Sequence, residues 1–153
     1  MRKIFIFIIF MSIHLQENAH SVNLEKLNNI KMEVFRNGKN IGFCNYKFIR
    51  NNNLLKVENK TKFEVKVLGI KAFSIDSTGT EIYENNNLIF FQSKTLQNKK
   101  KKFVNLKYLK AKNKFFIDGS SYKGQANINN IIGNWWNYKI LNASSQISPL
   151  SGS

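Results

Sequence analysis

The segment "LLKVENKTKFEVKV" (residues 54–67) decides the fold class. Its apolar and β-branched side chains alternate with charged ones, a period of two that is typical of a β-strand with one packed face and one wet face. Charges of both signs share the wet face, which predicts cross-strand ion pairs rather than a binding surface of a single sign. The predicted packed face consists of Leu55, Val57, Thr61, Phe63, Val65 and Val67.

Short turn signals divide the rest of the chain into similar strands. Asn37-Gly38 predicts a type I′ hairpin, because that turn needs positive φ at both central residues. Asn-rich or Lys-rich turns follow at 51–53, 85–87 and 98–101, and no long segment has the helical period of 3.6. The sequence therefore predicts an all-β fold, a curved antiparallel meander that forms a half-barrel or open barrel. The predicted strands are 31–35, 41–50, 54–67, 71–84, 88–97, 102–111 and 115–119, with a bulge or sharp curvature at Gly79, a loop over 120–130 and a last strand through Trp135 and Trp136.

The first 21 residues have the parts of a secretory signal peptide. Arg2 and Lys3 precede an apolar run over 4–13, and Ala19-His20-Ser21 supplies small residues at the positions that a signal peptidase requires. The alternative is a buried N-terminal strand or helix. We expect cleavage after Ser21, a single antiparallel β domain over 22–153, and a periplasmic protein that is soluble after cleavage.

The net charge of +15 favours anionic partners such as anionic membranes, envelope polymers or nucleic acid. Compositional drift explains the charge equally well, because Lys greatly outnumbers Arg, whereas sites that read phosphates or bases favour the bidentate Arg fork. The most basic segment, "LQNKKKKFVNLKYLK" (residues 96–110), is interpreted as a basic turn that leads into a mixed strand. Nucleic acid is therefore the least favoured of these partners.

Few residues could carry catalysis. Both histidines, His14 and His20, lie in the predicted signal peptide, and a single cysteine excludes an intrachain disulfide. Cys44 is interpreted as a small buried hydrophobe rather than as a nucleophile, since no base accompanies it. The positions of Asp76 and Glu81 differ by an odd number, so a regular strand places them on opposite faces, whereas a bulge at Gly79 would bring them together as a carboxylate pair. Surface acids of a basic domain are the favoured interpretation of both. No catalytic residue, metal or cofactor is predicted.

The pair of tryptophans in "NWWN" (134–137) suggests a binding site. Adjacent side chains on a strand face opposite sides, so one indole enters the core and the other faces outward or closes the open end of a barrel. The alternative is that both indoles pack, one of them under the loop over 120–130. The candidate ligand-binding residues on the concave face are Phe63, Phe91, Trp135, Trp136 and Asn137.

Several stretches together resemble a family of exported bacterial proteins classed only as a domain of unknown function: "GKNIGFCNYKF" (38–48), "VKVLGIKAFSIDSTGTEIYENNNLIFFQSKT" (65–95), "NWWNYKIL" (134–141) and "PLSG" (149–152). The most characteristic positions are Gly42, Glu81 with Leu88, and Trp136-Asn137. The resemblance implies a curved periplasmic sheet, similar to the half-barrels of lipoprotein and lipid carriers, and no catalytic residues. Such domains continue with further strands past a glycine like Gly152, which implies either a truncated sheet or an edge that a partner chain closes.

Three functions are compatible with these patterns. The first is a non-enzymatic carrier with an apolar or lipid-like ligand in the concave face. The second is a structural envelope protein that has no ligand because its own aromatic residues fill the concavity. The third, and least favoured, is a basic module that binds single-stranded nucleic acid. An enzyme that uses only carboxylates is a still more distant alternative.

Overall fold

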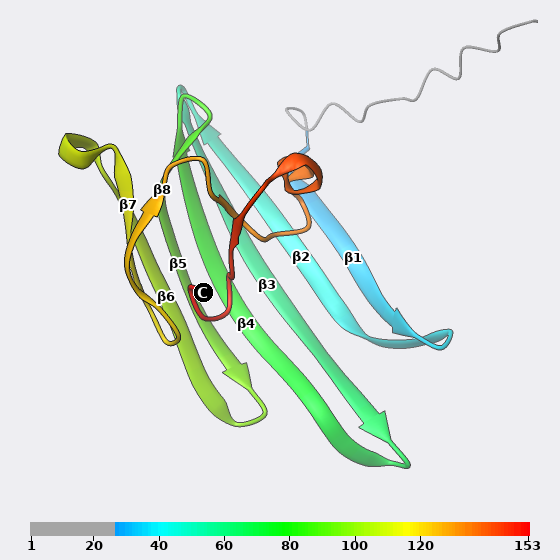
Figure 1. The fold of residues 1–153 in the computed structure, drawn as a ribbon. Coiled ribbons are helices and arrows are strands. Elements are labelled where there is room, and N and C mark those ends of the chain that lie inside the picture. Colours follow the sequence, from blue (N-terminus) through cyan, green and yellow to red (C-terminus); the bar gives the residue numbers. More distant parts are fainter. Residues whose placement is uncertain (1–26) are drawn as a thin grey trace, which may run out of the picture.

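The computed structural model describes residues 27–153, so the predicted signal peptide lies outside the described residues. Eight antiparallel strands form one sheet in chain order (Figure 1), which confirms the predicted all-β meander. The strands are β1 (Asn29–Arg36), β2 (Lys39–Asn51), β3 (Leu54–Val67), β4 (Ile70–Glu84), β5 (Asn87–Gln97), β6 (Lys100–Leu109), β7 (Lys114–Gly119) and β8 (Lys123–Asn127).

Tight hairpin turns explain why neighbouring strands in the chain are neighbours in the sheet. Asn37 and Gly38 have φ of 49° and 74°, which confirms the type I′ turn that the sequence predicts there. Positive φ also occurs at both central residues of the turns Leu68-Gly69, Asn85-Asn86 and Asn98-Lys99. Asn and Gly tolerate this conformation best, and these turns match the right-handed twist of the strands that they join.

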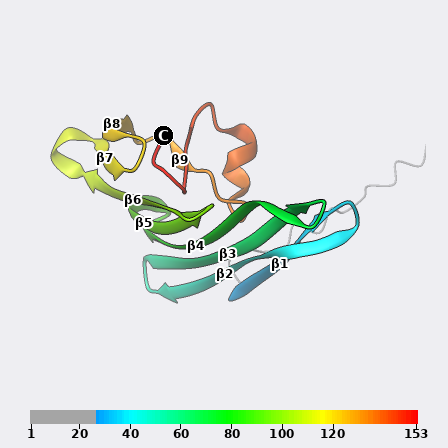
Figure 2. The ribbon, with the colours of Figure 1, turned by 90° about the horizontal axis from the view of Figure 1, so that it is seen from below.

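The sheet is curved and open, because β1 and β8 are its two edges and do not pair with each other. The chain after β8 crosses the concave side of the sheet (Figures 1 and 2). This crossing segment contains a short parallel pair, β9 (Ile131–Ile132) with β10 (Gln146–Ile147), and the 3-10 helix η3 (Tyr138–Asn142). A further 3-10 turn, η2 (Lys110–Lys112), connects β6 to β7. No helix within residues 27–153 is long and apolar enough to span a bilayer.

The core lies between the concave face and the crossing segment, in two clusters. We call the first the β1–β4 cluster; its buried residues are Cys44, Tyr46, Phe48, Val57 and Tyr83. We call the second the β5–β8 cluster; its buried residues are Phe91, Val104, Leu106, Phe115, Ile117, Ile132 and Ile147.

The convex face is wet and charged, as the alternation in 54–67 predicts. Lys62 on β3 pairs with Asp76 on β4 at 3.7 Å, and Lys71 pairs with Glu64 at 2.6 Å. These contacts confirm cross-strand ion pairing on this face. Each pair is exposed and contributes about 0–1 kcal/mol, so the apolar clusters rather than the ion pairs stabilise the fold.

Two local predictions are wrong, and one of the two alternatives at Gly79 is excluded. The predicted loop over 120–130 contains β8, an edge strand that has no apolar alternation to reveal it. The predicted strand through the tryptophans is instead a turn that leads into η3. Gly79 continues the regular register with Asn59 and Ser93, so it forms no bulge. The register shifts lie at Val34/Phe35, Val65/Lys66 and Ile82/Tyr83.

Candidate functional site: a cavity under the crossing segment

Small side chains in register leave a hollow in the middle of the concave face. Thr61 pairs with Cys44 on one side and with Ser77 on the other, and one register step away Gly79 pairs with Ser93. Opposed strand residues lie side by side on one face of a sheet, so several small residues at the same level create a depression. The floor of the hollow is formed by Cys44, Asn59, Thr61, Ser77, Gly79 and Ser93.

Large side chains and the crossing segment border this hollow, which forms a half-open cavity of about 240 Å³. The aromatic rings of Phe63 on β3 and Phe91 on β5 contribute to its apolar walls. Two parts of the crossing segment form its roof. They are Gly133–Trp135, which precede η3, and Ser148–Leu150, which follow β10.

Polar groups in the floor are bonded to one another, so the surface that they present to the cavity is largely apolar. Ser77 and Thr95 share a hydrogen bond of 2.7 Å, and Cys44 Sγ shares one of 3.0 Å with Thr61 Oγ1. Asn59 Nδ2 donates to Thr61 Oγ1 at 3.2 Å. Within residues 27–153, no buried side-chain nitrogen or oxygen lacks a partner. The cavity therefore fits a mainly apolar ligand.

The end of the roof is bonded directly to the sheet. Ser93 Oγ donates to the Pro149 carbonyl at 2.5 Å, and the Ser121 amide donates to the Ser151 carbonyl at 3.0 Å. Gly119 lets this segment approach closely, because a Cβ there would stand 2.5 Å from the Ser151 oxygen. These contacts hold the roof residues Ser148–Leu150 against the sheet in this structure.

A buried carboxylate, Glu81, bonds the other part of the roof to β4. Only 1% of Glu81 is exposed, although it lies in a basic domain. Its Oε1 accepts hydrogen bonds from Asn134 Nδ2 at 2.6 Å and from Trp136 Nε1 at 2.9 Å, and its Oε2 accepts one from the Tyr83 hydroxyl. We call Glu81, Tyr83, Asn134 and Trp136 the Glu81 clasp. It joins residues more than fifty positions apart in sequence.

Burial dominates the electrostatics of the clasp. Desolvation raises the pKa of Glu81 above its ordinary value, and the hydrogen bonds from Tyr83, Trp136 and Asn134 offset part of that rise. Burial, together with the adjacent Glu81 carboxylate, also raises the pKa of Tyr83. The pKa of Tyr46 is raised mainly by burial. Tyr46 is fixed in place as well, since its hydroxyl accepts a hydrogen bond from the Trp135 amide at 3.2 Å.

The structure brings together three of the five candidate ligand-binding residues. Phe63, Phe91 and Trp135 line the cavity, and Trp135 lies at its rim with 56% of its surface exposed. Trp136 is outside the lining and belongs to the clasp, with its ring edge-on to Phe48 at 5.3 Å between centroids. Asn137 is also outside the lining, where its side chain accepts from the Lys139 amide and caps η3.

The prediction that Glu81 is a surface acid is wrong, whereas Asp76 does lie on the exposed face. Because positions 76 and 81 differ by an odd number, the two carboxylates lie on opposite faces of β4, as expected. Glu81 is on the buried face with Ser77 and Tyr83. Two of its donors, Asn134 and Trp136, could not be inferred, because they reach it from the crossing segment.

Sequence reasoning also missed the small residues of the floor and the roof at 148–150. The equal spacing of Ser77, Gly79 and Glu81 on one strand face was the available signal.

The cavity offers little for acid–base or metal chemistry. Glu81 does not line it, and both of its oxygens already accept hydrogen bonds. Cys44 does line it, buried as predicted, with its sulfur bonded to Thr61. Within residues 27–153, no three His, Cys, Asp or Glu side chains are grouped closely enough to hold a metal ion. The arrangement is suited to binding by shape and burial.

Comparison with known proteins gives one match. No curated protein and no solved structure matches the chain. The model of a family described as "Domain of unknown function (DUF6134)" matches residues 32–153, a range that includes the complete strands β2 to β10, the cavity and the Glu81 clasp. The matched range covers most of the chain, and this protein therefore belongs to the DUF6134 family.

Proposed function

We propose that this domain is a non-enzymatic binding module that holds a small apolar or lipid-like ligand in the cavity under the crossing segment. The observation that carries the proposal is the half-open hollow of about 240 Å³, whose lining is mainly apolar. A concave site with a mainly apolar lining and a few polar groups is the usual form of a small-molecule site, and this hollow has that form. Its floor presents few free polar groups to a ligand, because Cys44 is hydrogen-bonded to Thr61 and Ser77 to Thr95.

The size and lining indicate the ligand class. Pockets for drug-sized ligands measure about 300–1,000 Å³, so the ligand here is smaller, such as a short acyl chain or a compact ring system. Phe63 and Phe91 offer aromatic surface, while Trp135 at the rim combines an apolar ring with a polar N–H. Such a rim suits a ligand whose polar end remains in water.

We also propose that the domain acts after export to the periplasm. The support is the order of basic residues, apolar run and small residues in 1–21, which is typical of a signal peptide. In that compartment a carrier or sensor of apolar molecules has a use, because these molecules cross water poorly without a protein that buries them.

Binding of N-phenyl-1-naphthylamine tests the cavity. This dye is apolar and uncharged, so the net charge of +15 does not attract it. We expect saturable fluorescence enhancement with one site per chain. Gly79→Val places a branched side chain in the floor, where a Cβ has only ordinary contacts at 3.5 Å, and should weaken dye binding at least about tenfold.

Thr78→Val is the matched control. It places the same residue, valine, one position away on the exposed face of β4, and it should leave dye affinity unchanged. Both variants should show the far-UV circular dichroism of the wild type. No saturable binding, or equal affinity in Gly79→Val and the wild type, would contradict the cavity proposal and favour a structural role without a ligand.

A further inference from the structure

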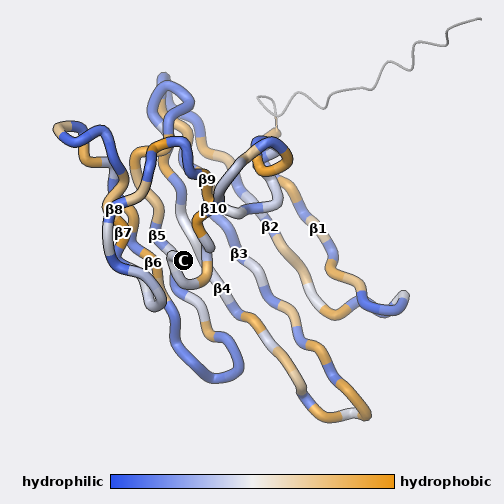
Figure 3. Tube along the Cα trace, in the orientation of Figure 1, coloured by the Kyte–Doolittle hydropathy of each residue, from blue (hydrophilic) through white to orange (hydrophobic). Residues whose placement is uncertain are grey.

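The hairpin that joins β3 to β4 ends in an apolar tip exposed to solvent. Leu68 is 96% exposed, Ile70 is 74% exposed and Val67 is 49% exposed. They lie at one turn, and the tube at this turn is coloured as hydrophobic in Figure 3. Contiguous exposed apolar side chains of this kind mark a surface that contacts another apolar phase.

This tip also projects beyond its neighbours. With 14 and 15 residues, β3 and β4 are the longest strands of the sheet. Figure 1 shows their hairpin extending past the β1–β2 and β5–β6 turns, which lie at the same end of the sheet. A flat surface that approaches this end therefore meets Leu68 before it meets the rest of the domain.

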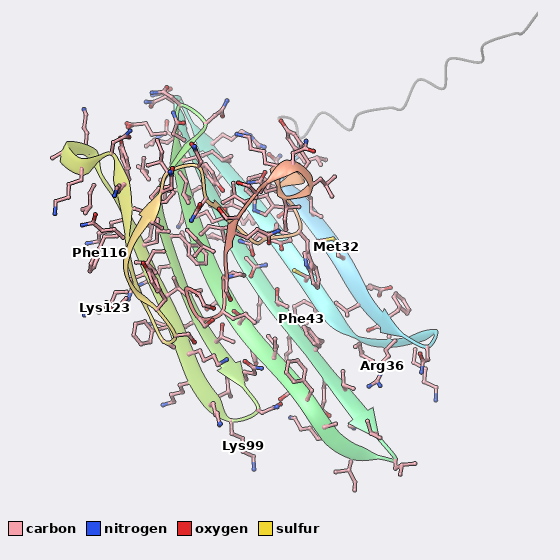
Figure 4. All side chains as sticks on the ribbon, in the orientation of Figure 1. Met32, Arg36, Phe43, Lys99, Phe116 and Lys123 are labelled. Atoms are coloured by element: carbon pink, nitrogen blue, oxygen red, sulfur yellow. The ribbon has the colours of Figure 1, made fainter. Side chains whose placement is uncertain are left out.

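Basic residues surround the apolar tip. Arg36 at the β1–β2 turn and Lys99 at the β5–β6 turn point outward at this end of the sheet (Figure 4). On the hairpin itself, Lys66 and Lys71 flank the tip, and Glu64 is the acid with which both pair. The exposed cations at the two neighbouring turns are Arg36, Lys39, Lys99, Lys100 and Lys101.

We propose that the β3–β4 tip inserts into the surface of an anionic lipid bilayer. Leu68 and Ile70 would enter the boundary between headgroups and acyl chains, and the surrounding cations would lie against anionic headgroups. The long lysine side chains can keep their ammonium groups among the headgroups while their stems remain near the apolar tip. This contact lies at the rim of the sheet, outside the lining of the cavity, so it is independent of the proposed ligand.

Charge decides between a bilayer and a second copy of the chain. Two copies that met at this end would bring their basic turns together, and each chain carries a net charge of +15. Like charges juxtaposed across an interface are unfavourable, whereas an anionic bilayer complements them. The bilayer is therefore the occupant that these side chains fit.

An environment-sensitive dye at position 68 tests the insertion directly. Leu68→Cys in a Cys44→Ser background gives one labelling site, to which a nitrobenzoxadiazole dye is attached. Asn52→Cys, in the turn at the opposite end of β3, is the matched position, because Asn52 and Leu68 both have φ of 51°. With vesicles of phosphatidylcholine and phosphatidylglycerol, we expect a blue shift at position 68 and none at position 52.

Changing the lipid composition and the salt concentration tests whether the contact depends on charge. The shift should weaken with pure phosphatidylcholine vesicles and with salt, which screens the headgroup contacts. No shift at position 68, or equal shifts at both positions, would overturn the proposal. A shift that grows with protein concentration without vesicles would overturn it too, in favour of a second copy.

Vesicle co-sedimentation of the full, unlabelled chain gives a second measurement. Leu68→Asn should weaken binding to the anionic vesicles about tenfold or more, as expected for one apolar side chain withheld from lipid. Leu141→Asn makes the same change at another residue, 83% exposed in η3, and should have no effect. Residues 1–26 are identical in both variants, so they contribute equally. Equal binding by Leu68→Asn and wild type would contradict the proposal.

Discussion

Glu81 accepts hydrogen bonds from three neutral side chains in a site that excludes water. Replacing it with leucine keeps a similar volume but leaves the donors of Tyr83, Asn134 and Trp136 without an acceptor. Each unsatisfied buried group costs about 1–3 kcal/mol, so Glu81→Leu should lower the free energy of unfolding by at least about 3 kcal/mol. Glu81→Gln retains an amide oxygen for two donors and should cost less than about 1.5 kcal/mol. Urea unfolding measures both, and equal costs would contradict the clasp.

The pH dependence of unfolding, compared between the wild type and Glu81→Gln, reports the charge of Glu81. Burial raises the pKa of Glu81 in the folded chain above its ordinary value of 4.5, so the folded state binds this proton more tightly than the unfolded state. The free energy of unfolding contributed by Glu81 therefore falls as pH rises from about 4.5 through the raised folded pKa. The glutamine variant lacks this titration. Wild type should lose stability relative to Glu81→Gln over that window, and a relative gain would contradict the assignment.

Two glycines of the sheet, Gly42 on β2 and Gly79 on β4, differ in how closely the neighbouring strand approaches them. At Gly42, with φ of 156°, an added Cβ would stand 2.1 Å from the backbone oxygen of Lys62. Gly42→Ala must therefore push β2 from β3 and should cost more than about 2 kcal/mol in urea unfolding. At Gly79 the nearest atoms are 3.5 Å away, so Gly79→Ala should change stability by less than about 1 kcal/mol. A similar cost at both positions would show that general strand propensity, not close approach, governs Gly42.

The contrast between these glycines shows how far the sequence predicts the elements. Alternation and Asn-rich turns are local signals, so the hairpins from β1 through β7 could be predicted, and so could the separation of Asp76 from Glu81. The close approach at Gly42 depends on where β3 lies, which local patterns do not encode. Only the assembled sheet distinguishes Gly42 from Gly79.

The crossing segment could not be predicted for the same physical reason. Its structure comes from long-range contacts, such as Ser93 with Pro149 and Glu81 with Asn134, rather than from its own periodicity. The two isoleucines and two tryptophans within 131–136 resemble a strand in sequence, although Asn137 directly after them caps η3. Phe63, Phe91 and Trp135 could be proposed because large aromatics on a concave face are conspicuous. The roof that encloses them could not, because it forms only when the segment docks.

At the scale of the whole molecule, the crossing segment connects two hydrophobic clusters that the sheet alone would keep side by side. Ile132 is buried in the β5–β8 cluster, while Trp136 packs against the β1–β4 cluster. Leu88 on β5 packs against both clusters. A domain joined in this way at the sheet and across its concave face should unfold as one cooperative unit.

A substitution in one cluster should therefore destabilise the other. Trp135→Phe leaves Trp136 as the single indole, and its ring contacts with Phe48 and Tyr83 make its fluorescence a reporter of the β1–β4 cluster. Ile132→Ala in this background should lower the free energy of unfolding by about 2–5 kcal/mol, the usual cost of truncating a buried isoleucine. Circular dichroism reports all the strands, and its urea midpoint should move together with that of Trp136 fluorescence. A fluorescence midpoint that stays in place while the circular dichroism midpoint falls would show that the clusters unfold independently and that the crossing segment does not couple them.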